Sequence, residues 1–194
     1  MLAFGFCRVE LCRLTLFPMR FLVGAAALAF ALDRASKMWI VAHIPLGGRM
    51  ELVPGWIHLQ HVANHGAAWS VLSGQRWFLV LFTLVVIGVL FFSAREVARQ
   101  GALAATGFGL ILGGALGNFL DRALQGYVTD FFDMDTSVEW IRTFPVFNVA
   151  DSALTVGVVL LILAMLGKQL RSRRPAQAAL QGETPVNAEP SNNV

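Results

Sequence analysis

Long apolar stretches alternate with short polar segments along the chain, and this pattern predicts four membrane-spanning helices. The stretches run from Phe21 to Val41, from Trp77 to Phe92, from Ala102 to Phe119, and from Ala153 to Leu166 with its flanks. They approach the roughly 20 residues that a helix needs to cross the hydrocarbon core of a bilayer. We therefore expect a mainly α membrane protein whose residues 21–167 form a four-transmembrane-helix bundle.

The segments outside these stretches are predicted to be small or irregular. Residues Glu51 to His61 alternate in polarity and contain aromatic and β-branched residues around a Pro54-Gly55 turn. They predict a small extracytoplasmic β element between the first and second spans. Residues 1–20 are expected to form a cytoplasmic N-terminal arm, and residues 168–194 a cytoplasmic tail that is basic and then, after Arg174, disordered.

The composition agrees with a membrane protein. Hydrophobic residues make up 56% of the chain and charged residues 14%, whereas an ordinary soluble domain is about one quarter charged. The net charge of +3 does not indicate nucleic-acid binding, because the basic residues lie beside the apolar stretches and form no patch interleaved with aromatic residues. Cys7 and Cys12 lack the spacing of a zinc site or a disulfide framework. We expect no metal and no cofactor.

Basic residues also predict the topology. They precede the first stretch, separate the second from the third, and follow the fourth, so the positive-inside rule places both termini in the cytoplasm. The segments 42–76 and 120–150 are then external. The basic residues concerned are Arg8, Arg13, Arg20, Arg95, Arg99, Lys168, Arg171, Arg173 and Arg174.

The N-terminus has a second interpretation. Its arginines, the apolar stretch and Ala29-Phe30-Ala31 also resemble a cleavable signal peptide. We favour a retained span because the stretch is long enough to cross the membrane. Met19 is an alternative start of the chain.

Ionisable side chains inside membrane helices are costly and indicate functional sites. Asp33 and Lys37 lie in the outer part of the first span, four residues apart on one helix face, where they can pair while the lysine reaches outward. An ion pair that only anchors the helix is the alternative.

The third and fourth spans carry further polar residues at their outer ends. Asn118, Asp121 and Arg122 follow three glycines that allow close helix packing: Gly113, Gly114 and Gly117. Asn148 and Asp151 open the fourth span, where capping of the helix start explains one of them but not both. Asp130 lies between the spans, beside Phe131 and Phe132.

Opposite span directions bring these side chains to the same outer leaflet, so we expect one pocket. Two carboxylates in a partly dry site share one proton. One of them can then activate a water towards a peptide carbonyl while the other donates a proton. This chemistry predicts an aspartyl peptidase. The converging residues are Asp33, Asn118, Asp121, Asp130, Asn148 and Asp151.

The sequence lacks residues and motifs that other functions would need. The four histidines lie in the first external segment without a G-x-S-x-G motif, which argues against a serine hydrolase. Asp133 and Asp135 begin a calcium-loop pattern, but Val138 replaces its glycine. A proton or cation transporter would spread its carboxylates across the membrane, and a structural scaffold would not need two Asn-x-x-Asp pairs.

Five motifs, in order, resemble the lipoprotein signal peptidases over about residues 21–167. They are Asp33-Arg-Ala-Ser-Lys37, Asn64-His-Gly-Ala-Ala-Trp-Ser70, Gly113 to Arg122, Val128-Thr-Asp130-Phe131, and Phe147-Asn-Val-Ala-Asp151-Ser152. The resemblance implies that Asp130 and Asp151 are the catalytic pair; spacing alone would not choose Asp130 over Asp121.

The resemblance also implies supporting roles. Asn64, Asn118, Arg122 and Asn148 would bind substrate or orient the pair, Asp121 would hold Arg122, and Asp33 and Lys37 would support them. The implied substrate is a prolipoprotein whose lipobox cysteine carries diacylglycerol, cut on the N-terminal side of that cysteine. The enzyme would be a monomer in the bacterial inner membrane, in contact with membrane lipids. Arg34 departs from the usual glutamine of the family, and Thr129 interrupts a usual pair of valines.

Overall fold

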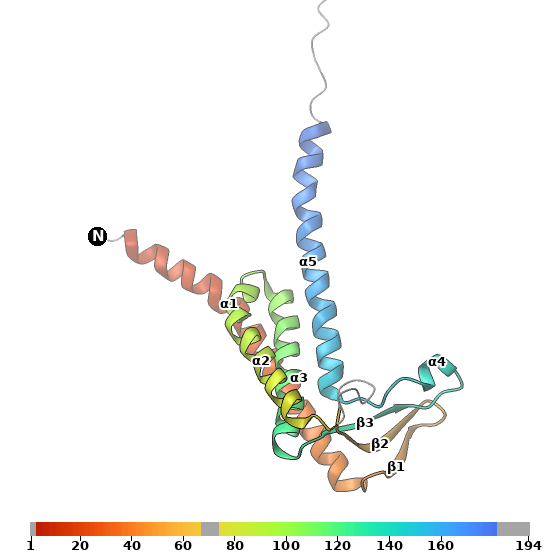
Figure 1. Cartoon of the computed structure of the whole chain (residues 1–194). Helices are drawn as coiled ribbons and strands as arrows, with labels where there is room; N and C mark the ends of the chain where they lie inside the picture. Colours follow the sequence, from red (N-terminus) through yellow and green to blue (C-terminus); the bar gives the residue numbers. More distant parts are fainter. Residues whose placement is uncertain (1–2, 67–73, 182–194) are drawn as a thin grey trace, which may run out of the picture.

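The computed structural model describes residues 3–66 and 74–181, which form five helices and three strands (Figure 1). The helices are α1 (Ala3–His43), α2 (Arg76–Ala98), α3 (Ala102–Leu124), α4 (Glu139–Arg142) and α5 (Val149–Gln181). The strands are β1 (Arg49–Val53), β2 (Ile57–Asn64) and β3 (Val128–Met134).

The four apolar stretches fall in α1, α2, α3 and α5, which confirms the mainly helical fold. Within the described residues, three helical segments are long and apolar enough to cross a membrane: Arg76–Ala98, Ala102–Leu124 and Val149–Arg171. The fourth span, assigned to α1, stays a prediction. Helix α5 continues as a helix to Gln181, past the position where the sequence predicts a disordered tail.

Helix α3 is the centre of the bundle and packs against α1, α2 and α5. Its glycines make this possible, as the sequence predicts. A side chain at Gly113 would collide with the backbone of α1 at Ala26, and a Cβ at Gly114 would lie 2.5 Å from the carbonyl oxygen of Ala150 in α5. Small residues at these positions let the backbones approach closely.

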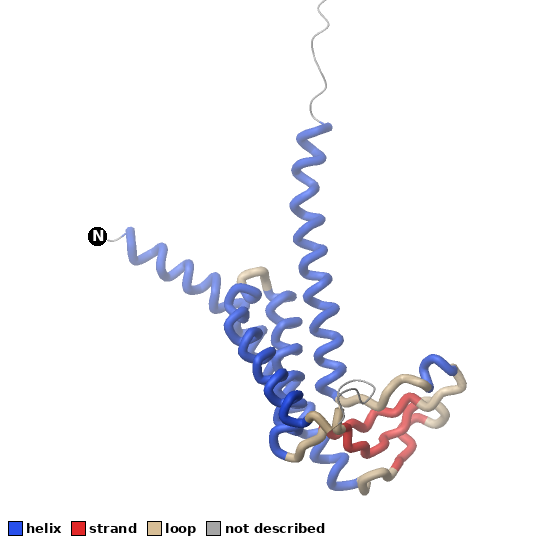
Figure 2. The backbone as a smooth tube through the Cα atoms, viewed as in Figure 1, coloured by secondary structure: helices blue, strands red, loops and turns tan. Residues whose placement is uncertain are grey.

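The strands form one antiparallel sheet at the end of the bundle where α1 ends and α5 begins (Figure 2). The predicted hairpin is present: β1 and β2 are joined at Pro54-Gly55, where Gly55 has a φ of +70°. The sheet is fixed to α1 by a buried cluster of Ile40, Ile44, Leu59 and Phe131.

The predicted β element is incomplete, because a third strand comes from the segment between α3 and α5. Strand β3 pairs with β2, so that Asp130 lies opposite Val62. Its first four residues are buried, and they therefore lack the alternation of polarity that reveals a half-exposed strand. The sheet thus carries Asp130 to the end of α3 and the start of α5.

Candidate active site

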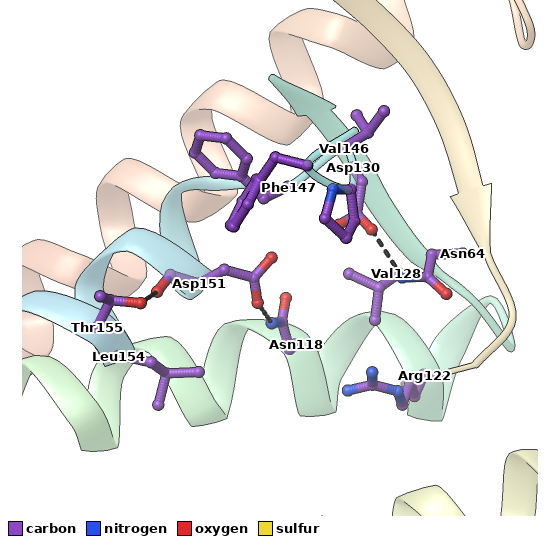
Figure 3. A pocket seen from close by; sticks show the side chains of 12 residues that line it. Asn64, Asn118, Arg122, Val128, Asp130, Val146, Phe147, Asp151, Leu154 and Thr155 are labelled. Atoms are coloured by element: carbon purple, nitrogen blue, oxygen red, sulfur yellow. Dashed lines mark hydrogen bonds between the residues drawn. The ribbon is translucent and has the colours of Figure 1, made fainter. Parts of the chain in front are cut away.

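A cavity of about 280 Å³ lies where β3 meets the ends of α3 and α5 (Figure 3). Its wall includes aromatic and aliphatic side chains, among them Phe144, Phe147 and Leu154. Five of the nine predicted site residues line it: Asn64, Asn118, Arg122, Asp130 and Asp151.

Asp130 is held in β3 with only 3% of its surface exposed. Its Oδ2 accepts a hydrogen bond of 2.8 Å from the Asn64 side chain, and its Oδ1 accepts one of 2.6 Å from the Asn148 side chain. Burial raises the pKa of Asp130 to about 6, and the nearby Asp151 carboxylate acts in the same direction. The two amide donors favour the ionised form and limit this rise. Asp130 is therefore suited to hold a proton near neutral pH.

Asp151 lies in the first turn of α5 and faces the same cavity (Figure 3). Its Oδ1 accepts a hydrogen bond of 2.8 Å from the Asn118 side chain. Its Oδ2 accepts one of 3.1 Å from the backbone N–H of Asn148, while the Asn148 side-chain oxygen accepts the backbone N–H of Asp151 at 3.0 Å. This reciprocal pair is a capping box. Capping therefore involves both residues, and it fixes the Asp151 carboxylate at the helix start.

Asn148 connects the two carboxylates. Its side chain is fully buried, and its Nδ2 donates to Asp130 and, at 3.2 Å, to the side-chain oxygen of Asn118. Asn118 in turn donates to Asp151. A short chain of amides, of which Asn118 lines the cavity, therefore joins Asp130 to Asp151.

Asp33, Lys37 and Asp121 lie behind the site and do not line the cavity. The predicted Asp33–Lys37 pair is present at 3.0 Å. The lysine does not reach outward as predicted, however: it is 1% exposed, and its Nζ also contacts the Asp121 carboxylate at 2.9 Å and the Asn118 side-chain oxygen at 2.7 Å. Carboxylate and amide partners within the protein replace the water that it would meet outside.

The predicted pairing of Asp121 with Arg122 is wrong. Asp121 pairs with Arg34 at 2.6 Å and with Lys37, whereas Arg122 lines the cavity and donates to the carbonyl oxygen of Gly66 at 3.1 Å. Successive side chains on an α-helix diverge by about 100°. The two neighbours therefore point in different directions, Asp121 towards α1 and Arg122 towards the cavity.

Some residues in or next to the site were not recognised from the sequence. Arg34 was noted only as a departure from a family pattern, although a cation inside an apolar stretch was a usable signal. The Gly66 carbonyl and the aromatic wall gave no such signal. Residues 67–70 of the motif that begins at Asn64 lie outside the described residues.

Two carboxylates on one partly dry cavity, at the ends of membrane-length helices, are typical of a membrane-embedded aspartic peptidase. The comparisons with known proteins agree with this class. The family model described as signal peptidase (SPase) II matches residues 25–167. The chain belongs to the signal peptidase II family, and it is a membrane protein and an aspartic peptidase of that type.

Individual relatives are similar over most of their length. A protein named lipoprotein signal peptidase from Listeria welshimeri is 41% identical over 133 residues, which are 69% of this chain and 84% of the relative. One with the same name from Latilactobacillus sakei is 42% identical over 137 residues, 71% of this chain and 87% of the relative. A solved structure described as a bacterial membrane enzyme has 31% identity and a TM-score of 0.69, covering 86% of this chain and 94% of that one.

Proposed function

We propose that this peptidase removes signal peptides from prolipoproteins whose cysteine carries diacylglycerol, and that it cuts on the N-terminal side of this cysteine. The observation that carries the proposal is the pair Asp130 and Asp151 on one cavity, joined through Asn148. The relatives named lipoprotein signal peptidase support this substrate class.

The environments of the two carboxylates suggest their roles. Asp130 is the more enclosed and has the raised pKa, so it holds the proton and donates it to the scissile carbonyl oxygen. Asp151 accepts a proton from a water molecule, which attacks the carbonyl carbon. The C–N bond then breaks as the leaving amine takes a proton from the dyad. Arg122 and Asn64, on the cavity wall, bind the substrate backbone.

A second, apolar cavity of about 320 Å³ supports entry of a lipid-bearing substrate from the bilayer. It adjoins the first cavity at Asp151 and is lined by Phe144, Phe147, Thr155 and Val156. An acyl chain placed there would set the modified cysteine beside the carboxylates.

The pH dependence should respond to Asn64. Its amide stabilises the ionised form of Asp130, so Asn64→Ala is expected to raise the pKa of Asp130 further above its ordinary value. If Asp130 keeps its proton to a higher pH, the fall of kcat/KM on the alkaline side of the pH profile also moves to higher pH. The profile of purified enzyme, measured beside the exposed-site variant Gln100→Ala, checks this; an alkaline fall that stays in place or moves to lower pH contradicts it.

We further propose a monomer in the bacterial inner membrane, with α1 as a fourth span, both termini cytoplasmic and the active site at the outer leaflet. Reporter fusions after Gly74 and Arg142 are expected to report the outer compartment, and fusions after Arg99 the cytoplasm. An outer signal from the Arg99 fusion contradicts this topology.

The function is tested with purified enzyme, a diacylglyceryl-modified prolipoprotein and the same substrate without the lipid. We expect cleavage of the modified form before its cysteine, weak or no cleavage of the unmodified form, and no requirement for an added cofactor. Failure to cut the modified form in lipid, by enzyme that is folded and intact at both aspartates, overturns the proposal.

A further inference from the structure

Four charged side chains form a cluster behind the candidate active site. Asp33, Arg34 and Lys37 come from α1 and Asp121 from α3, and the ionic contacts between them include Lys37–Asp33 at 3.0 Å, Lys37–Asp121 at 2.9 Å and Arg34–Asp121 at 2.6 Å. The cluster contains two cations and two carboxylates. Three of the four side chains are at most 3% exposed, and that of Arg34 is 21% exposed.

Each carboxylate of this cluster also holds the backbone immediately before one of the paired aspartates. Asp33 Oδ1 accepts a hydrogen bond of 3.1 Å from the N–H of Ala150, which precedes Asp151. Asp121 Oδ2 accepts one of 3.3 Å from the N–H of Thr129, which precedes Asp130. The cluster is thus connected separately to α5 and to β3, the two elements that must be in register for both carboxylates to face one cavity.

Arg34 completes the charge balance of the cluster. Lys37 is shared between Asp33, Asp121 and the Asn118 side chain, and it cannot neutralise two buried carboxylates alone. Arg34 binds Asp121 Oδ1, which leaves Oδ2 directed at Lys37 and at the N–H of Thr129. A charge-assisted contact of this kind fixes the orientation of a carboxylate.

We propose that Arg34 is a positioning residue: by pairing with Asp121 it orients that carboxylate, and thereby holds β3 and Asp130 in register with Asp151. The proposal rests on the proposed function of the Asp130–Asp151 pair. Arg34 does not touch the substrate cavity; it lines a separate cavity of about 480 Å³ with Asp121, Gln125 and Thr129. Its loss should therefore lower kcat and leave KM unchanged.

The test compares Arg34→Gln, Arg34→Lys, Asp121→Asn and the double variant Arg34→Gln/Asp121→Asn in the full-length protein. Cleavage of the diacylglyceryl-modified prolipoprotein gives kcat and KM, and membrane abundance and the thermal midpoint in detergent are measured in parallel. We expect Arg34→Gln to lower kcat about fivefold at unchanged KM and Arg34→Lys to restore most of it. We expect the double variant to be no worse than Asp121→Asn alone, because removing both partners restores the charge balance.

Two results overturn the proposal: a kcat of Arg34→Gln equal to that of wild type, or losses in the two single variants that multiply in the double variant. A fall in abundance or thermal midpoint that accounts for the whole loss of activity also overturns it, because Arg34 would then only stabilise the fold. In each case wild-type cleavage shows that the proposed function itself stands, and Asp151→Asn in the same assay supplies the inactive reference.

Discussion

Replacing either Asp130 or Asp151 with asparagine is expected to reduce cleavage of a lipid-modified prolipoprotein by about 10³-fold or more. Asparagine keeps the volume and two polar atoms but cannot exchange the shared proton. The two groups act as a unit, since both face one cavity and both are joined to Asn148. The double variant should therefore cost little more than either single change. Initial rates with purified enzyme, normalised to membrane abundance, give the comparison.

Two other carboxylates close to Asp130 in the chain provide matched controls. Asp133 and Asp135 both pair with Arg49 on the sheet, at 2.9 and 2.8 Å, and away from the cavity. Partly exposed pairs of this kind contribute about 0–1 kcal/mol. Asp133→Asn and Asp135→Asn should remain near wild type. If Asp130→Asn cleaves normally at wild-type abundance while Asp121→Asn is inactive, the pair is Asp121 with Asp151.

Helices α1, α2, α3 and α5 were predictable because each contains a long continuous stretch of apolar residues, whereas the four-residue helix α4 contains none. The β1–β2 hairpin was predictable too, since its turn carries the local signal Pro54-Gly55. Strand β3 was not recognised, because a short run buried on both faces has no distinctive period. Its partner β2 is also remote in the chain: Thr129 pairs with Ala63. Pairing over such a separation is decided by tertiary packing.

The same holds for the site: contacts within one helix were predictable from the sequence, and contacts between distant elements were not. Spacing predicted the Asp33–Lys37 pair, and the span directions predicted that the polar residues meet at one end of the bundle. Spacing could not show which face of α3 meets α1. Packing determines this: the Asp33 carboxylate occupies the space that a side chain at Gly117 would fill, so the α3 face that bears Asp121 turns towards α1. Arg122 is thereby directed to the cavity.

Lys37→Met is expected to cause the second large loss, through the fold and not through the reacting groups. Methionine keeps the length of the side chain and removes its charge. The Asp33 and Asp121 carboxylates, 0% and 2% exposed, would lose the cation that they share. Asp121 would keep Arg34 at 2.6 Å, whereas Asp33 would keep only a longer contact of 3.9 Å with Arg34. Breaking a buried ion pair in this way costs about 3–5 kcal/mol. Membrane abundance, the thermal midpoint in detergent and cleavage should all fall.

A second variant distinguishes the loss of the Lys37 charge from a simple loss of packing. Asp33→Asn/Lys37→Met leaves Arg34 and Asp121 as a balanced pair, so it should accumulate to a higher level than Lys37→Met although it carries one more substitution. Lys168→Met, at an exposed position of α5, controls for the loss of a lysine and should behave as wild type. Since Lys37 also holds Asn118, which donates to Asp151, the balanced variant should recover abundance more fully than cleavage. Wild-type abundance and activity in Lys37→Met would mean that the two carboxylates do not need their shared cation.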